Sequence, residues 1–137
     1  MEAQRIMTLR VELGSPLSIG RVPGGELTIL PITGGTFLGP RLRGRVLAGG
    51  ADWNTRMPGG ISHACARYWI QTDDGAVISV HNEGLLQSDA APDGFQTTPR
   101  FQCDLDGPYA FLTRGLYAGT VQGAGEGAVD IGIWQID

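Results

Sequence analysis

A glycine-rich stretch over residues 34–53, GGTFLGPRLRGRVLAGGADW, constrains the fold of this chain more than any other segment. It holds too many glycines for a helix, and it is too apolar for a disordered linker. Gly-Gly pairs lie on both sides of a strand-like run over residues 41–48. Because glycine permits sharp turns and close approach of two backbones, we expect a corner of a small, strongly curved β-structure. We expect Asp52 and Trp53, which end the stretch, at the rim or mouth of that structure.

The other patterned segments alternate between apolar and polar residues at a period of two, which is typical of β-strands. Glycine and proline turns separate them, and the Asp-Gly turn at residues 72–75 predicts a hairpin. We expect strands at residues 7–13, 26–32, 41–48, 61–71, 76–82, 100–104 and 128–136. Residues 109–118 fit either a strand or one helical turn. We interpret residues 85–99 as a loop that covers a barrel mouth, and residues 119–127 as a hairpin loop.

The length of 137 residues gives room for one hydrophobic core, so we expect a single domain over residues 1–137. The 22 glycines are spread along the chain, which fits many short strands joined by turns. About eight to ten antiparallel strands must avoid open edges, and closure into an up-and-down barrel removes every edge. We therefore predict an all-β fold, a single closed antiparallel β-barrel. A β-sandwich is the alternative.

Charge and composition exclude several classes of function. All ten basic residues are arginine, and Schiff-base catalysis, pyridoxal attachment and a P-loop each require a lysine. The net charge of −4 argues against a nucleic-acid partner. No apolar run is long enough to cross a membrane and residues 1–13 lack signal-peptide features, so we expect a cytoplasmic protein without membrane association. Cys65 and Cys103 are then expected to be reduced, with a disulfide between them as the alternative.

Asp52, beside Trp53, is the leading candidate for a catalytic group. A carboxylate next to an indole at a strand end can be desolvated, which raises its pKa toward the range useful for proton transfer. The alternative is a structural one, in which Asp52 accepts backbone N–H hydrogen bonds from the turn at Gly49 and Gly50.

Arg67 and Tyr68 are neighbours on the longest expected strand, so their side chains point to opposite faces. The face of Tyr68 also carries Ala64 and Ala66, whose small side chains leave room for a ligand, and a buried tyrosyl hydroxyl needs a partner. We therefore expect Tyr68 inside the barrel as a second catalytic group. In the alternative, the face of Arg67 is interior and its cationic group suits a carboxylate or an enolate.

His63 and His81 lie on the two strands of the predicted hairpin, and together with Asp52 they could form a metal-binding facial triad. No familiar spacing of metal-ligating residues supports this set, so we expect no metal and no other cofactor. Asn82 precedes a Glu-Gly pair, and we expect it either in a turn or in a hydrogen bond to a ligand.

Five sequence blocks then carry a resemblance that covers nearly the whole chain after its first strand. They are GGTFLGPRLRGRVLAGGADW, ARY at residues 66–68, TDDGAVISVHNEG at residues 72–84, TPRF at residues 98–101 and YAFLTRGLYAGT at residues 109–120. In this order they resemble the motifs of the family called domain of unknown function 3237, the UPF 0311 proteins. The resemblance implies a small all-β barrel with a central small-molecule pocket, and relatives that look like cyclases or isomerases of natural-product or aromatic pathways. Leu112 and Thr113 depart from the family, which more often has Leu-Asn there.

Three functions are compatible with these observations. The first is a cofactor-independent enzyme, an isomerase, cyclase or lyase, that moves protons on a small apolar cyclic or aromatic compound with Asp52 and Tyr68. The second is a carrier or sensor that binds the same ligand unchanged. The third is a structural or homo-oligomerisation module whose barrel is filled with side chains. The residues expected to contact a substrate are Trp53, Arg67, His63, Asn82 and Tyr109.

Overall fold

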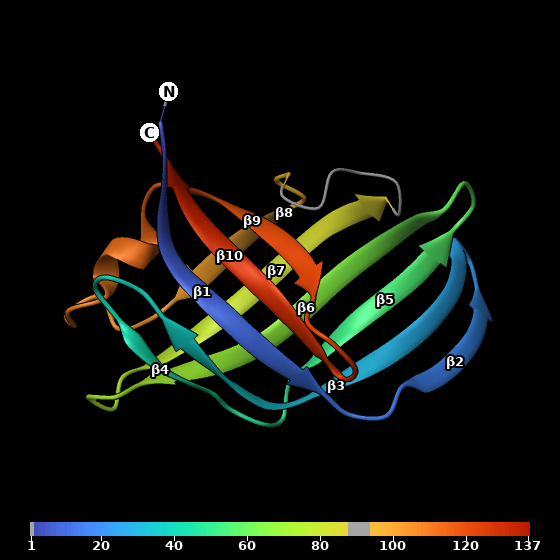
Figure 1. Ribbon diagram of the computed structural model, residues 1–137, viewed down its shortest axis with the longest axis horizontal. Helices are drawn as coiled ribbons and strands as arrows, with labels where there is room; N and C mark the ends of the chain where they lie inside the picture. Colours follow the sequence, from blue (N-terminus) through green and yellow to red (C-terminus); the bar gives the residue numbers. More distant parts are fainter. Residues whose placement is uncertain (1, 88–93) are drawn as a thin grey trace.

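The computed structural model describes residues 2–87 and 94–137 of the chain. These residues form ten β-strands and one short 3₁₀ helix (Figure 1). In chain order the elements are β1 (Ala3–Leu13), β2 (Leu17–Val22), β3 (Gly25–Leu38), β4 (Arg43–Val46), β5 (Ala51–Met57), β6 (Ile61–Thr72), β7 (Val77–Gln87), β8 (Thr97–Gln102), the 3₁₀ helix η1 (Ala110–Thr113), β9 (Leu116–Gly123) and β10 (Ala128–Ile136). None of the helical structure in these two ranges is long and apolar enough to cross a bilayer.

The strands close into an antiparallel barrel. β1 and β2 act as one bent strand, because both pair with the same edge of β3. β4 and β5 likewise share the other edge of β3, and both then pair with β6. The ten strands therefore occupy eight positions, and the ring closes where β1 pairs with β10. Figure 1 shows these two strands side by side, with both termini at one end. The prediction of a closed up-and-down barrel is confirmed, and the sandwich alternative is wrong.

Several strand boundaries differ from those expected from the sequence. β2 and β5 were not predicted, and β1 begins at Ala3 rather than at Met7. The expected loop over residues 85–99 is wrong at both ends, because β7 continues through Gln87 and β8 begins at Thr97. Residues 88–93 of that expected loop lie outside the described residues. The ambiguous segment at residues 109–118 contains both alternatives, η1 followed by the start of β9. β9 also extends to Gly123, into the expected hairpin loop.

The inside of the barrel is packed at one end only. The packed end carries the β6–β7 turn and η1, and Leu112 of η1 is buried there at 2% exposure. Its core residues are Ile6, Met7, Leu9, Phe37, Leu42, Val46, Ile70, Ile78, Val80, Phe101, Leu112, Tyr117 and Ile133. Toward the opposite end, which carries the β5–β6 and β9–β10 turns, inward positions become small or polar, as at Ala64 and Asn82. Cys65 and Cys103 are both free thiols, so the disulfide alternative is wrong.

Candidate functional site

The end of the barrel opposite η1 contains a cup with a cavity volume of about 160 Å³. Its walls are mainly aliphatic, and Tyr68 lies at the boundary between the cup and the packed core. The lining residues are Val11, Leu13, Leu30, Ile32, Asp52, Asn54, Ala64, Ala66, Tyr68, Asn82, Leu86, Thr97, Val121, Val129 and Ile131. An apolar cavity of roughly 150 Å³ in another protein accepts benzene. The cup therefore has the size of a compound with one small ring.

Asp52 contributes a carboxylate to this cup from β5. Its Oδ1 accepts a hydrogen bond of 2.9 Å from the backbone N–H of Cys65 on β6. Burial raises the pKa of Asp52 above its ordinary value of 3.8, and the Cys65 N–H, the Asn54 side chain and the charge of His63 counteract only part of that rise. A carboxylate with a raised pKa is a stronger base toward a weakly acidic C–H group than a solvated one.

The alternative role of Asp52 as an acceptor for the turn at Gly49 and Gly50 is wrong. That turn is held by Ile32, whose carbonyl accepts from the N–H of Gly49 at 3.2 Å and whose N–H donates to the carbonyl of Gly50 at 2.8 Å. The expected position at the barrel rim is also corrected, because Asp52 lies within the wall, paired with Leu30 of β3 and Ala66 of β6.

Three buried polar atoms around the cup have no hydrogen-bond partner among the described residues. They are the hydroxyl of Tyr68, Oδ1 of Asn82 and Oγ1 of Thr97. The side chains of all three residues are buried, at 2%, 3% and 4% exposure. A buried polar atom without a partner costs about 1–3 kcal/mol, and most such atoms in folded proteins are hydrogen-bonded. Three of them around one cavity indicate that a ligand or water completes the site.

Strand register arranges these groups around an open space. Asp52 of β5 pairs with Ala66 of β6, and Ala66 pairs with Asn82 of β7, so the three form one row across the inner wall. The Cα atoms of Asp52 and Asn82 are therefore separated by two strand spacings, or roughly 10 Å. Because the residue between them is alanine, their polar groups face a common gap. Tyr68 lies two residues along β6 from Ala66, toward the packed core.

The prediction that Tyr68 lies inside is confirmed, and the alternative with Arg67 inside is wrong. Three residues expected to contact a substrate, Trp53, Arg67 and His63, lie on the outer wall, one position away from an inward side chain. Trp53 is 43% exposed, so the apolar cup rather than the indole desolvates Asp52. Asn82 is within β7 and lines the cup, so its alternative role in a turn is wrong.

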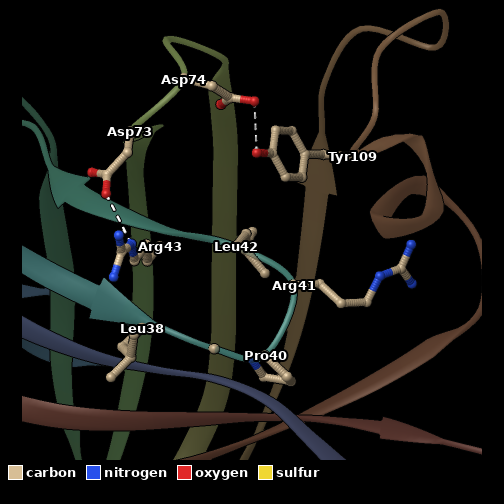
Figure 2. A pocket seen from close by; sticks show the side chains of 9 residues that line it. Leu38, Pro40, Arg41, Leu42, Arg43, Asp73, Asp74 and Tyr109 are labelled. Atoms are coloured by element: carbon tan, nitrogen blue, oxygen red, sulfur yellow. Dashed lines mark hydrogen bonds and ion pairs between the residues drawn. The ribbon is translucent and has the colours of Figure 1, made fainter.

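Tyr109 does not reach the cup either, because it lies at the packed end of the barrel (Figure 2). Its hydroxyl donates a hydrogen bond of 2.9 Å to Oδ2 of Asp74 in the β6–β7 turn. The hollow in Figure 2 is open and has a volume of about 450 Å³. Its second aspartate, Asp73, is paired with Arg43 at 3.1 Å. Tyr109 and Asp52 therefore cannot contact one small ligand together.

The facial triad of His63, His81 and Asp52 does not form. Asp52 faces the cup, whereas both histidines lie on the outer wall and contact Glu83 instead. Sequence reasoning also missed Thr97 and Asn54 as cup residues. Thr97 lay in an expected loop, and Asn54 lay in a segment without apolar alternation, so neither carried a strand signal.

Comparison with known proteins gives a consistent result. A family model described as "Protein of unknown function (DUF3237)" matches residues 1–136. A UPF0311 protein of Rhodopseudomonas palustris (strain TIE-1) is 32% identical over 134 residues, which covers 88% of this chain and 87% of that protein. The crystal structure of a β-barrel-like protein from Acinetobacter baumannii has a TM-score of 0.86 at 27% identity, covering 99% of this chain and 96% of that one. A crystal structure described as an enzyme from Penicillium herquei has a TM-score of 0.77 at 25% identity, covering 99% and 94%.

Proposed function

Since the chain belongs to the DUF3237 family, whose description assigns no activity, we propose that its barrel is a cofactor-independent enzyme for proton transfer. The substrate is a small apolar cyclic or aromatic compound bound in the cup. The reaction is of the isomerase, cyclase or lyase type. The observation that carries the proposal is the presence of a carboxylate with a raised pKa and an unpaired tyrosyl hydroxyl in one apolar cavity. The structural similarity to a fungal protein described as an enzyme supports it further.

In this mechanism Asp52 is the general base. It removes a proton from a C–H group next to a carbonyl. The electron pair of that C–H bond forms a C=C bond, and the carbonyl π electrons move onto the oxygen to give an enolate. The hydroxyl of Tyr68 donates a hydrogen bond to the enolate oxygen. Burial raises the pKa of Tyr68 above its ordinary range, so the phenol keeps its proton and serves as a donor. The proton held by Asp52 returns to another carbon in an isomerisation, or to a leaving group in a lyase reaction.

Asn82 and Thr97 position the ligand in this proposal. Both line the cup and contribute unpaired buried oxygens, which can accept hydrogen bonds from a ligand hydroxyl. The aliphatic walls exclude water and strengthen the electrostatic interactions inside the cup.

The proposal is tested by hydrogen exchange in cyclohexanone, a six-membered ring with acidic C–H groups next to its carbonyl. Deuterium uptake from D₂O is followed by NMR with the wild-type protein, Asp52→Asn and Tyr68→Phe. We expect the catalysed exchange rate to fall on the order of a hundredfold in Asp52→Asn and tenfold or more in Tyr68→Phe. The matched control is Asp130→Asn, which removes one carboxylate on β10 outside the cup and retains the wild-type rate. A full rate in Asp52→Asn contradicts the proposal.

A carrier or sensor is the second candidate, and the unpaired atoms of the cup favour it as well. A ligand that is bound without being changed satisfies the hydroxyl of Tyr68 and the amide of Asn82 as effectively as a substrate does. Binding of cyclohexanone to the cup without exchange above the buffer rate supports this function. A structural module is disfavoured, because its barrel has no need of an unfilled cavity.

A further inference from the structure

Four side chains with metal-ligating groups gather on the outer wall of the barrel, across β6 and β7. His63 and Cys65 are two residues apart on β6, and His81 and Glu83 are two residues apart on β7. Side chains two residues apart on a strand project from the same face. Cys65 pairs directly with Glu83 in the strand register, so the four residues form a compact patch on adjacent strands.

Two of the three distances between the ligand atoms already match those around a tetrahedral metal ion. Sγ of Cys65 lies 3.5 Å from Nε2 of His81, and that nitrogen lies 3.4 Å from Oε1 of Glu83. The three atoms all lie within 4.8 Å of one another. Ligand atoms bound tetrahedrally to zinc at its usual bond lengths are roughly 3.3–3.6 Å apart. Binding an ion therefore requires at most that the ligand atoms of Cys65 and Glu83 move closer to each other.

We propose that Cys65, His81 and Glu83 bind one Zn²⁺ ion on the outer wall of the barrel. Thiolate, imidazole and carboxylate together form a donor set typical of zinc. The thiol of Cys65 loses its proton to solvent as the Zn–S bond forms, and the oxidation state of the sulfur does not change. This inference replaces the expectation of no metal, which rested on the absence of familiar spacings. On two paired strands, the spacings H-x-C at residues 63–65 and H-x-E at residues 81–83 place metal-ligating side chains on one face without any of those familiar spacings.

His63 is a positioning residue in this site. Its Nε2 lies 2.6 Å from Oε2 of Glu83, the carboxylate oxygen that does not contact His81. The contact between His63 and Glu83 fixes the carboxylate of Glu83 so that Oε1 points toward Cys65 and His81. Hydrogen bonds of this kind to a ligating group commonly contribute ten- to a hundredfold in metal affinity.

A hollow of about 170 Å³ lies beside two of the three ligands and is lined by His81, Glu83, Thr98 and Arg100. Arg67 and Arg100 pair with His81 from the two neighbouring strands, so guanidinium groups flank the site. Their charge opposes a free cation but favours an anion or hydroxide on the metal. The zinc site lies on the opposite side of the wall from the cup, and the inference therefore goes beyond the proposed function.

Cobalt binding tests the zinc site directly. Chelator-treated protein, kept reduced with a phosphine, is titrated with Co²⁺ and observed by absorption spectroscopy. We expect a single equivalent to bind with a thiolate-to-cobalt band in the near ultraviolet, and one equivalent of Zn²⁺ to remove that band. Cys65→Ser abolishes the band, and His81→Gln weakens Co²⁺ binding on the order of tenfold or more. The matched control is Cys103→Ser. This variant retains the thiolate-to-cobalt band, because Cys103 contacts the carbonyl of Tyr109 and not the proposed site.

The proposal is overturned if the wild-type protein gives no such band, if the band survives in Cys65→Ser, or if Cys103→Ser loses it.

His63→Gln separates a positioning role from direct ligation. We expect this variant to bind Co²⁺ about tenfold more weakly with the same visible spectrum, because the ligand set is unchanged. A changed spectrum makes His63 a ligand, and an unchanged affinity overturns its positioning role.

Discussion

Asp52 illustrates how one residue can lower stability and still suit a function. An ionised carboxylate inside an apolar cavity loses hydration, and its hydrogen bonds with the N–H of Cys65 and the side chain of Asn54 compensate only partly. A residue that served only the fold would not need a charge at this position. The unpaired hydroxyl of Tyr68, also in the cup, leads to the same conclusion.

The desolvation of the Asp52 carboxylate predicts how the free energy of unfolding depends on pH. The folded-state pKa of Asp52 is raised, so its protonated form is favoured in the native protein. The native state then binds more protons than the unfolded state between the ordinary value of 3.8 and the raised pKa. The free energy of unfolding of the wild type, relative to Asp52→Asn, should therefore fall as pH rises through this window and stay constant above it. Urea denaturation from pH 3 to pH 8 measures both proteins.

The control for the pH profile is Asp130→Asn, which also removes one carboxylate but from an exposed ion pair with Arg10 at 3.9 Å. We expect Asp52→Asn to be more stable than the wild type near neutral pH, and Asp130→Asn should not show this gain in the free energy of unfolding. If Asp52→Asn is instead less stable than the wild type at neutral pH, the carboxylate contributes to folding and its catalytic role loses support.

At the scale of elements, the strands with clear alternation or clear turn signals are those that could be predicted. β10 alternates along most of its length, and β6 lies between a Pro-Gly-Gly break and an Asp-Gly turn. Both strands were predicted within one residue of their observed ends. β5 was missed because its inward residues include Asp52 and Asn54, which break the apolar pattern. The polar residues of the candidate site therefore prevented the prediction of β5 from its sequence, as expected where function overrides local sequence preference. β2 was missed because it pairs with β3 alone and has no buried residues.

In the glycine-rich stretch, the expected turn at Gly34 and Gly35 is wrong, because both residues lie within β3, where Gly35 pairs with Val11 of β1. The φ of Gly35, +138°, is unfavourable for other residues, and a Cβ there would collide with the backbone carbonyl of Arg10 on β1. Gly35→Ala should therefore lower the free energy of unfolding by about 2 kcal/mol or more, measured by urea denaturation. Gly123→Ala is the control, because no atom lies within 4 Å of a Cβ at that position. Equal stability of the two variants would contradict a structural need for glycine at Gly35.

At the scale of the whole molecule, the barrel divides its length between a packed core and a cup. About eight strands enclose enough space for side chains or for one small ligand, and this barrel contains both a packed core and a small cavity beside it. The closed barrel and the inward direction of Tyr68 could be predicted from alternation and turn signals. The end that holds the cup could not, because it depends on register between strands far apart in sequence. For the same reason Tyr109 was assigned to a site from which it is distant.

Filling the cup tests this division of the barrel. Ala66 lies in the row between Asp52 and Asn82, so Ala66→Leu places a larger apolar side chain in the gap between them. Filling a true cavity commonly stabilises a protein by about 0.5–2 kcal/mol, whereas overpacking a filled core costs about 1–3 kcal/mol. We therefore expect Ala66→Leu to unfold at the wild-type urea concentration or above it, and to lose both cyclohexanone binding and hydrogen exchange.

Ser79→Leu is the matched control, since it adds a leucine on the exposed face of the neighbouring strand β7. It should retain both cyclohexanone binding and hydrogen exchange. Three combinations of results separate the three functions. If Ala66→Leu folds stably and loses both cyclohexanone binding and hydrogen exchange, the enzyme is supported. If Ala66→Leu folds stably and loses binding, and the wild-type protein catalyses no exchange, the carrier is supported. Strong destabilisation by Ala66→Leu would mean that the space is already filled, and only the structural module would then be consistent with the barrel.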